Sequence, residues 1–249
     1  MEPANFCPGF CSQDRELHYD KLTVQGDFPN WLSGSLLRTG PALFELEHQN
    51  YNHWYDGLAM LFKFSFQNAA VSFSCKFLQS EAYLKARETG KAHFKEWATD
   101  PCKTVFEQAK SYFLAPNLTD NGNINIISYG EELLATSETP LPIIFDKDTL
   151  ETLERFDFKD DLTGHIDPAH PHYDAEGNVY SYMLKYGMFS TYQIYRMQAG
   201  SQKRDIIAEI NGQKIISIAD LQKQLSSKSK SWKLTIKRGE KFITLTVAG

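Results

Sequence analysis

Residues 199–249 lack four residue types that the rest of the chain uses freely. They contain no cysteine, proline, histidine or methionine, and Trp232 and Phe242 are their only aromatic residues. Without cysteine or histidine, this stretch supplies neither thiolate nor imidazole as a metal ligand. Its charge also differs, because it has 10 Lys and Arg against 4 Asp and Glu, whereas residues 1–198 have 16 against 27. This break indicates two pieces of separate origin.

Other absences bear on location and redox state. No apolar run approaches the roughly 18 residues of a membrane-spanning helix, and residues 1–14 lack a basic start followed by an apolar stretch. The cysteines are Cys7, Cys11, Cys75 and Cys102. Cys7 and Cys11 have no second pair at similar spacing, so reduced thiols are favoured over a zinc site. The sequence therefore predicts a cytoplasmic protein.

The first piece reads as many short strands. Residues 61–66 and 71–77 alternate large apolar and polar side chains, and the short connection 67–70 predicts a β-hairpin. A helix is predicted within 81–113, a strand break at Gly40-Pro41 and a turn at 146–150. Further strands are predicted at 31–38, 124–128, 132–137, 143–146, 153–158, 178–184 and 192–197. Such a series is typical of a sandwich, a barrel or a propeller, and periodicity does not choose among them.

The motifs narrow this choice. They include Pro29-Asn30-Trp31-Leu32-Ser33-Gly34, Leu37-Arg38-Thr39-Gly40-Pro41, His53-Trp54-Tyr55-Asp56-Gly57, Thr119-Asp120-Asn121, Ser137-Glu138-Thr139 and Ala169-His170-Pro171-His172-Tyr173-Asp174. In this order and spacing, over about residues 18–197, they resemble the N-terminal part of the carotenoid cleavage oxygenases. That family includes the β-carotene oxygenases and the isomerase of the retinal pigment epithelium.

The resemblance implies a seven-bladed β-propeller with a non-haem Fe(II) on its axis, held by four histidines. It also implies cleavage of a conjugated double bond in a carotenoid or apocarotenoid by O2, which gives two carbonyl products. A hydrophobic tunnel then delivers the substrate from a membrane surface, so the family predicts peripheral membrane contact. Neutral imidazole ligands suit Fe(II) and leave coordination positions open for O2.

Two positions of this chain match site residues of the family's motifs. His170, the first histidine of the Ala-His-Pro motif, matches an iron ligand. Glu138 matches a carboxylate that accepts the outer N–H of a ligand histidine and fixes its tautomer. His172 matches a variable position, and His53 matches a structural motif near the propeller core.

The departure from the family is an absence. The other three ligands lie on later blades, and this chain has no histidine after His172. We therefore expect two to three propeller blades and no stable Fe(II) binding. Because the active site would be incomplete, we assign no catalytic residue and expect no activity by the chain alone. Within this chain His170 is expected to be a solvated or hydrogen-bonded histidine and Glu138 a surface carboxylate. Exposed sheet edges predict instability or oligomers.

Three further groups of residues are expected to have structural rather than functional roles. Trp54, Tyr55 and the phenylalanine-rich hairpin are expected in the core rather than on a substrate wall. His165 and Asp167 are expected to be polar loop residues. The acidic residues at 157, 160 and 161 are expected to form a solvated turn.

The second piece has its own pattern. Strands are predicted at 205–210, 213–216, 232–236 and 243–247, with a turn at Asn211-Gly212 and a helix at 217–225. This pattern resembles the C-terminal half of a PDZ domain, particularly those of bacterial trypsin-like proteases. PDZ domains bind peptide C-termini by adding a strand to a sheet edge. That edge strand precedes this region in the family, and residues 197–204 are too few to supply it.

The sequence thus predicts a mainly β chain in three parts: a truncated propeller at 1–197, a linker at 198–204 and a small α+β half-PDZ segment at 205–249. The function implied is a truncated carotenoid oxygenase. The alternatives are a peptide-interaction module and a non-functional fusion relic. The basic segment lacks interleaved aromatic residues, so nucleic-acid binding is not expected.

Overall fold

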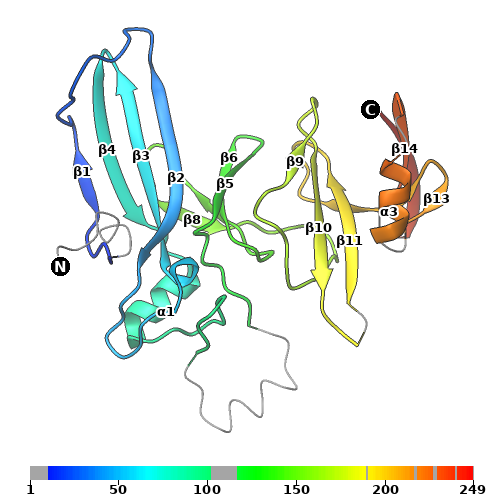
Figure 1. The fold of residues 1–249 in the computed structure, drawn as a ribbon, viewed down its shortest axis with the longest axis horizontal. Helices are drawn as coiled ribbons and strands as arrows, with labels where there is room; N and C mark the ends of the chain where they lie inside the picture. The colour runs from blue at the N-terminus through cyan, green and yellow to red at the C-terminus, as the bar shows by residue number, and fades with distance from the viewer. Residues whose placement is uncertain are drawn as a thin grey trace. The chain divides into compact units, whose positions relative to one another are not determined.

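The computed structural model describes residues 11–101, 117–188, 190–215, 218–226, 229–238 and 240–248. The chain forms two compact units, Met1–Phe156 and Asp157–Gly249. Cys7, Cys102 and the predicted helix start at Ser217 lie outside the described residues. Within them, all regular structure except the helices α1 and α3 and a single 3-10 turn is β (Figure 1).

The first unit contains two antiparallel sheets of four strands. The first has the order β1-β4-β3-β2, with β1 at Leu17–Tyr19, β2 at Gly34–Leu43, β3 at Leu58–Gln67 and β4 at Ala70–Phe77. The second has the order β5-β6-β7-β8, with β5 at Asn125–Tyr129, β6 at Glu132–Thr136, β7 at Ile143–Phe145 and β8 at Thr152–Arg155. The hairpin predicted at 67–70 is confirmed. Its two-residue turn places Asn68 and Ala69 at φ 51° and 56°, the twist that a tight hairpin needs.

The strand break predicted at Gly40-Pro41 is wrong, because β2 runs through both residues to Leu43. The sheet order explains this, since β2 lies at the edge of its sheet and, among the strands that the structure describes, pairs with β3 alone. Proline lacks the backbone N–H, and a strand edge is where that loss is tolerated. The pairing with β3 shifts register just beyond, between Pro41 and Leu43.

A shared apolar core holds the two sheets of the first unit together. Leu61 of β3 and Ala135 and Ile143 of the second sheet lie in one cluster, with Leu78 just after β4. Leu61, Leu78 and Ala135 have no exposed surface. Burying a leucine side chain stabilises the fold by about 1.5–3 kcal/mol. The predicted strands therefore pack as two layers rather than as isolated hairpins.

Helix α1, Glu81–Thr89, begins and ends as its sequence indicates. Ser80 caps the N-terminus by accepting the N–H of Tyr83, and Gly90 ends the helix at φ 68°. The carboxylate of Asp120 accepts the N–H groups of Glu81 at 2.8 Å and Ala82 at 2.9 Å. A carboxylate there satisfies unpaired amides and complements the positive end of the helix dipole.

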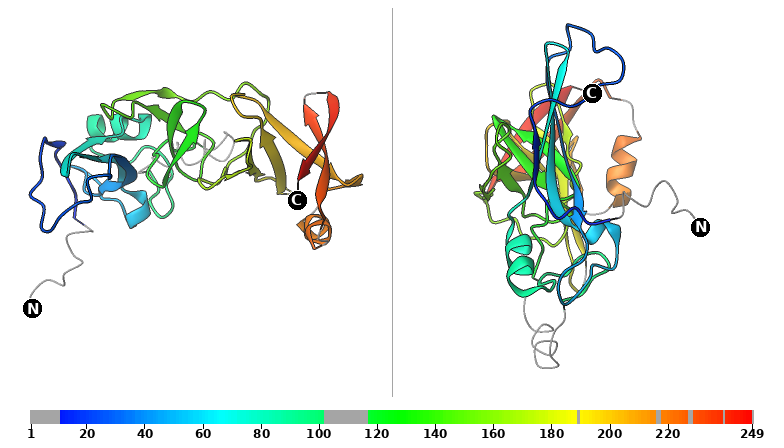
Figure 2. Two further views of the ribbon diagram at one scale, coloured as in Figure 1. Left: turned by 90° about the horizontal axis from the view of Figure 1, so that it is seen from above. Right: turned by 90° about the vertical axis from the view of Figure 1, so that its left-hand side faces the viewer.

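The second unit is built on one sheet of seven strands. The order is β15-β14-β12-β11-β10-β9, and β13 pairs with β12 off this path. Its strands are β9 at His172–Tyr173, β10 at Val179–Lys185, β11 at Thr191–Met197, β12 at Arg204–Ile210, β13 at Gln213–Lys214, β14 at Ser231–Arg238 and β15 at Lys241–Ala248. Helix α3, Ile218–Leu225, lies to one side of the C-terminal strands (Figure 2). The strands predicted at 205–210, 232–236 and 243–247 are confirmed, whereas the strand predicted at 213–216 extends only over Gln213–Lys214.

The sheet runs across the predicted linker. Tyr195, Arg196 and Met197 of β11 pair with Ile206, Asp205 and Arg204 of β12. The connection between them turns where the N–H of Ser201 donates to the carbonyl of Gln198. The structure thus joins residues 157–197 and 204–248 in one folded unit, while their separate origin stays a prediction.

A buried ion pair reinforces this junction. The guanidinium of Arg204 donates to both carboxylate oxygens of Asp160, at 2.7 and 3.0 Å, and stacks 3.9 Å from the ring centre of Phe158. Burial opposes the charged carboxylate, but the hydrogen bonds and charge of Arg204 prevail and lower the pKa of Asp160. The expectation that Asp160 lies in a solvated turn is wrong, because Arg204, the last residue of the predicted linker, folds onto it.

Asp167 lies in a loop, as the sequence predicts, but it is buried rather than solvated. It is 7% exposed and accepts the hydroxyl of Tyr195 at 2.9 Å. A nitrogen of Arg204 lies 3.7 Å from its carboxylate. Asp160 and Asp167 therefore share one buried cation.

Replacing Arg204 with methionine should destabilise the second unit strongly. The substitution leaves two buried carboxylates without their cation, and breaking such a pair costs about 3–5 kcal/mol. Urea unfolding followed by circular dichroism checks this, with the exposed neighbour Lys203→Met as the matched control. Equal unfolding midpoints for the two variants would contradict the role given to Arg204.

Candidate functional site

The strongest motif of the first unit builds a buried polar network. Asp56 has no exposed surface and accepts the hydroxyl of Thr99 at 2.7 Å. The amide of Asn121 donates to the carbonyl of Gly57 at 3.0 Å, and Asn123 donates to the same carbonyl at 2.8 Å. Buried polar groups need such partners, because an unpaired one costs about 1–3 kcal/mol. The network ties the Tyr-Asp-Gly turn to the segment at 119–123.

The aromatic residues of this motif lie at the surface. Trp54 and Tyr55 are 40% and 52% exposed. The expectation that they belong to the core is wrong, because they lie in the short 3-10 turn Trp54–Asp56, of whose residues only Asp56 is buried. His53 precedes the turn, and its Nδ1 accepts the N–H of Tyr55 at 3.2 Å. His53 therefore has a structural role, as the family resemblance implies.

Glu96, in the first unit, has a strongly perturbed carboxyl group. It accepts the hydroxyl of Thr119 at 2.6 Å. Burial raises its pKa to about 8, and the nearby carboxylates of Asp56 and Asp120 act in the same direction. No sequence pattern indicates this residue, since its environment forms only when residues 56, 96 and 119–120 meet in the fold.

The two residues transferred from the family lie in different units. Glu138 follows β6 in the first unit and is exposed, and its neighbours Ser137 and Thr139 bond to one another at 3.1 Å. His170 follows the buried Ala169 in the second unit and is itself exposed. Because Glu138 and His170 belong to different compact units, the role of Glu138 in orienting a histidine stays a prediction.

Other histidines are tied into local structure. His165 accepts the N–H of Tyr186 at 2.9 Å through Nδ1, and their rings stack at 5.6 Å. His18 lies 2.8 Å from the hydroxyl of Ser74, and His93 lies 2.8 Å from that of Thr89. Among the residues that the structure describes, no three His, Cys, Asp or Glu side chains gather closely enough to hold a metal ion.

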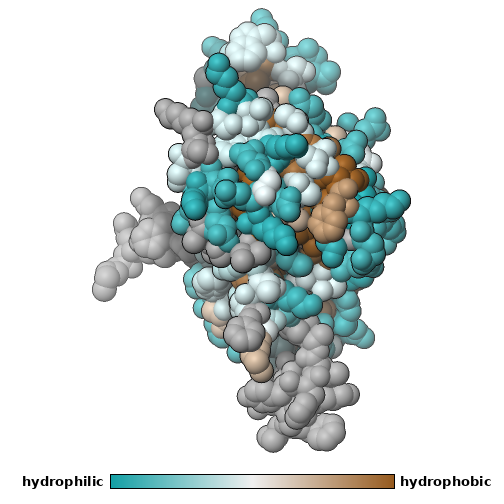
Figure 3. All heavy atoms as spheres, turned by 90° about the vertical axis from the view of Figure 1, so that its right-hand side faces the viewer, coloured by the Kyte–Doolittle hydropathy of each residue, from teal (hydrophilic) through white to brown (hydrophobic). Residues whose placement is uncertain are grey.

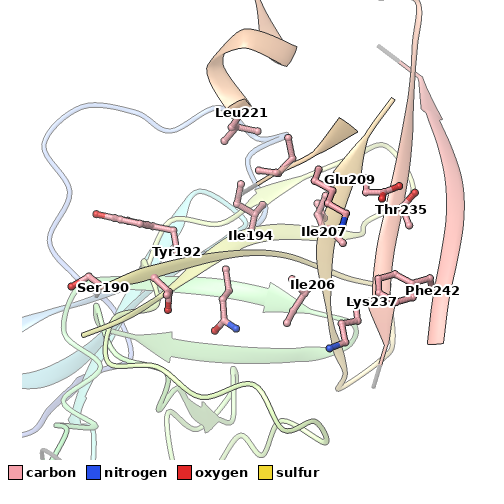
Figure 4. Close-up of a pocket in the computed structure, with 15 residues that line it drawn as sticks. Ser190, Tyr192, Ile194, Ile206, Ile207, Glu209, Leu221, Thr235, Lys237 and Phe242 are labelled. Atoms are coloured by element: carbon pink, nitrogen blue, oxygen red, sulfur yellow. The ribbon is translucent and has the colours of Figure 1, made fainter. Parts of the chain in front are cut away.

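The second unit contains an open groove of about 1030 Å³. Its lining is mostly apolar and comes from β11, β12, β14, β15 and α3, including Tyr192, Ile194, Ile206, Ile207, Leu221 and Phe242 (Figure 4). On the side of the molecule drawn in Figure 3, apolar side chains reach the surface among hydrophilic ones. Sequence reasoning missed this groove because its walls come from both sides of the predicted linker.

Comparison with known proteins identifies the lineage. The family model described as retinal pigment epithelial membrane protein, RPE65, matches residues 10–224. The chain belongs to the RPE65 and carotenoid cleavage oxygenase family. The match extends beyond the predicted linker, and none of the comparisons supports a PDZ relative or a fusion.

Curated members of the oxygenase family are clearly similar but longer. A mitochondrial carotenoid-cleaving dioxygenase of Mustela putorius furo is 37% identical over 85% of this chain and 40% of its own length. A beta,beta-carotene 15,15'-dioxygenase of Rattus norvegicus is 42% identical over 64% of this chain and 29% of its own. The chain thus spans well under half the length of these relatives.

Solved structures of the oxygenase family share the fold. A point mutant of the Synechocystis apocarotenoid oxygenase aligns with a TM-score of 0.66 and 19% identity, over 98% of this chain and 58% of that one. The cobalt-substituted form of that oxygenase aligns with a TM-score of 0.64 over 96% of this chain. The three antiparallel sheets match part of its β-propeller. In the described part of this chain, neither helix is long and apolar enough to cross a membrane.

Replacing Glu96 with glutamine should stabilise the protein in a pH-dependent way. The folded state keeps the Glu96 proton up to about pH 8, whereas the ordinary value, expected when unfolded, is 4.5. The parent therefore loses stability as pH rises through this window, by at most about 1.4 kcal/mol per pH unit. Glutamine retains an acceptor for Thr119 without the charge.

Urea midpoints at pH 5 and pH 8 test this expectation. The advantage of Glu96→Gln should be large at pH 8 and shrink toward pH 5. The exposed Glu88→Gln is the control and should change neither midpoint appreciably. An advantage for Glu96→Gln that is equal at both pH values would contradict the assignment.

Proposed function

We propose that this chain is the N-terminal part of a carotenoid cleavage oxygenase that is inactive by itself. In the complete enzyme the reaction would be cleavage of a carotenoid or apocarotenoid double bond by O2. His170 would supply one imidazole ligand to a non-haem Fe(II), and Glu138 would orient a ligand histidine contributed by a later blade. The family match over residues 10–224, combined with the length of the relatives, is the observation that carries this proposal.

The residues of a single copy do not fit a four-histidine ferrous site. The last histidine of the sequence is His172, and the earlier ones include His53 and His165, which serve turns and loops. No described group of three metal-binding side chains compensates for the missing ligands. An exposed His170 alone would bind Fe(II) weakly, because structural and catalytic sites use several protein ligands together. We therefore derive no catalytic step through iron for this chain.

We also propose the division at 198–204 as a boundary of ancestry. The break in charge and residue usage supports it. Continuity of the sheet across the junction is compatible with this, because Arg204 and Ile206 pair with β11 whatever their origin. The groove of the second unit favours interaction with another molecule as a second function.

Metal analysis tests the inactive-oxygenase proposal. The full chain, purified anaerobically with Fe(II), should hold far less than one iron per chain and should leave a carotenoid intact in the presence of O2. The variants His170→Ala and His172→Ala should leave this low iron content unchanged. Near-stoichiometric iron that is lost in His170→Ala but kept in His172→Ala would overturn the proposal, and would mean that a second copy or other ligands complete the site.

A further inference from the structure

Strand β11 leaves half of one edge unpaired. It pairs with β10 along its whole length, from Thr191 to Met197. On its other side it pairs with β12 only from Tyr195 to Met197. Among the residues that the structure describes, no strand pairs with that side of Thr191–Ile194. Backbone N–H and C=O groups alternate along such an edge and offer hydrogen bonds to an added strand.

The open edge faces the groove of the second unit. Beyond Ile206 strand β12 turns toward β14 and β13, so it diverges from β11. Both diverging segments line the groove, 191–194 on one side and 206–209 on the other, together with Leu221 of α3 (Figure 4). Ile194 and Leu221 pack against the buried cluster that contains Ile207. The groove therefore combines a free strand edge with apolar walls.

The chemistry of the groove selects an extended polypeptide over a lipid. A hydrocarbon chain would cover Ile194, Ile207 and Leu221 but would leave the edge of β11 without hydrogen bonds. An added peptide strand satisfies that edge, and it can direct its alternate side chains against the apolar walls. Gln193 lies on the same edge segment, and its Oε1 is buried and accepts no hydrogen bond from any described residue.

Charge at the rim favours an acidic partner. Lys237 lines the groove opposite Phe242 and forms no ion pair with a described residue. Glu209 and Lys214 also line it, but they lie directly opposite one another in the β12–β13 pairing. Cross-strand opposite charges attract, so these two offset each other. Lys237 is left as the cation available to a ligand.

We propose that this groove binds an extended peptide segment by adding it as a strand to β11. The peptide has apolar side chains at alternate positions and an acidic residue that reaches Lys237. This binding does not depend on iron or on oxygenase activity. Its failure would leave the proposed oxygenase ancestry untouched.

The test measures fluorescence anisotropy of labelled synthetic peptides mixed with the full chain. The probe is a capped peptide, Asp-Asp-Val-Thr-Val-Thr-Val, and its matched control carries N-methyl groups on alternate backbone amides. N-methylation keeps the side chains but removes strand hydrogen bonds. We expect the control to bind at least about 10-fold more weakly, because it loses more than one strand hydrogen bond.

Two pairs of protein variants locate the site. Ala208→Trp fills the groove and should abolish probe binding, whereas Ala199→Trp, on the exposed turn after β11, should not. Lys237→Gln should weaken binding several-fold at low salt and less at high salt, while Lys233→Gln, outside the groove lining, should have little effect. Circular dichroism confirms that each variant remains folded.

The outcomes distinguish a bound peptide strand from a bound hydrocarbon chain. Preference for the unmodified probe together with loss in Ala208→Trp supports strand addition. Equal binding of the N-methylated probe, or displacement of both probes by dodecanoate, would show a cavity for apolar chains and overturn the proposal. Absence of probe binding to the folded parent chain would overturn it as well.

Discussion

The pairing of β11 with β12 is the interaction on which the second unit depends. It joins Tyr195–Met197 to Arg204–Ile206 and so makes one sheet from two stretches of very different composition. Arg204 adds a buried ion pair with Asp160, on a loop that precedes β9 by sequence. The desolvation of such a pair is costly, and its geometry must be good to compensate. Here the guanidinium is held by several hydrogen bonds and by the ring of Phe158.

The same pairing connects fold to function. With β12 in place, β9, β10, β11 and β12 form an antiparallel meander like β5 to β8 in the first unit. The repeated four-stranded unit is the blade of a propeller, which agrees with the likeness to apocarotenoid oxygenase structures. Where β12 leaves β11 to follow β14, the sheet opens and the groove forms. The chain thus has the scaffold of an oxygenase family, and its second unit carries an open, mostly apolar groove.

Local patterns predicted most of the elements. Alternation and turn residues located the hairpin at 67–70, and Asn211-Gly212 located the turn after β12, with φ of 52° and 78°. Two strands were missed, β1 and β9, because three and two residues are too few for a periodic pattern. Pro41 was misjudged because its tolerance depends on the sheet order, which a local pattern does not contain. Burial of Asp160, Asp167 and Glu96 depends on partners distant in the sequence.

Hydrogen–deuterium exchange of the full chain, followed by mass spectrometry of its peptides, tests the central claim that one sheet crosses residues 198–204. If the sheet is continuous, amides in 195–197 and 204–206 should exchange slowly and together with those of β14. The amides of 191–194 that face the groove should exchange faster. Slow exchange confined to 205–248, with rapid exchange throughout 191–197, would show that the two stretches fold separately and would contradict the account.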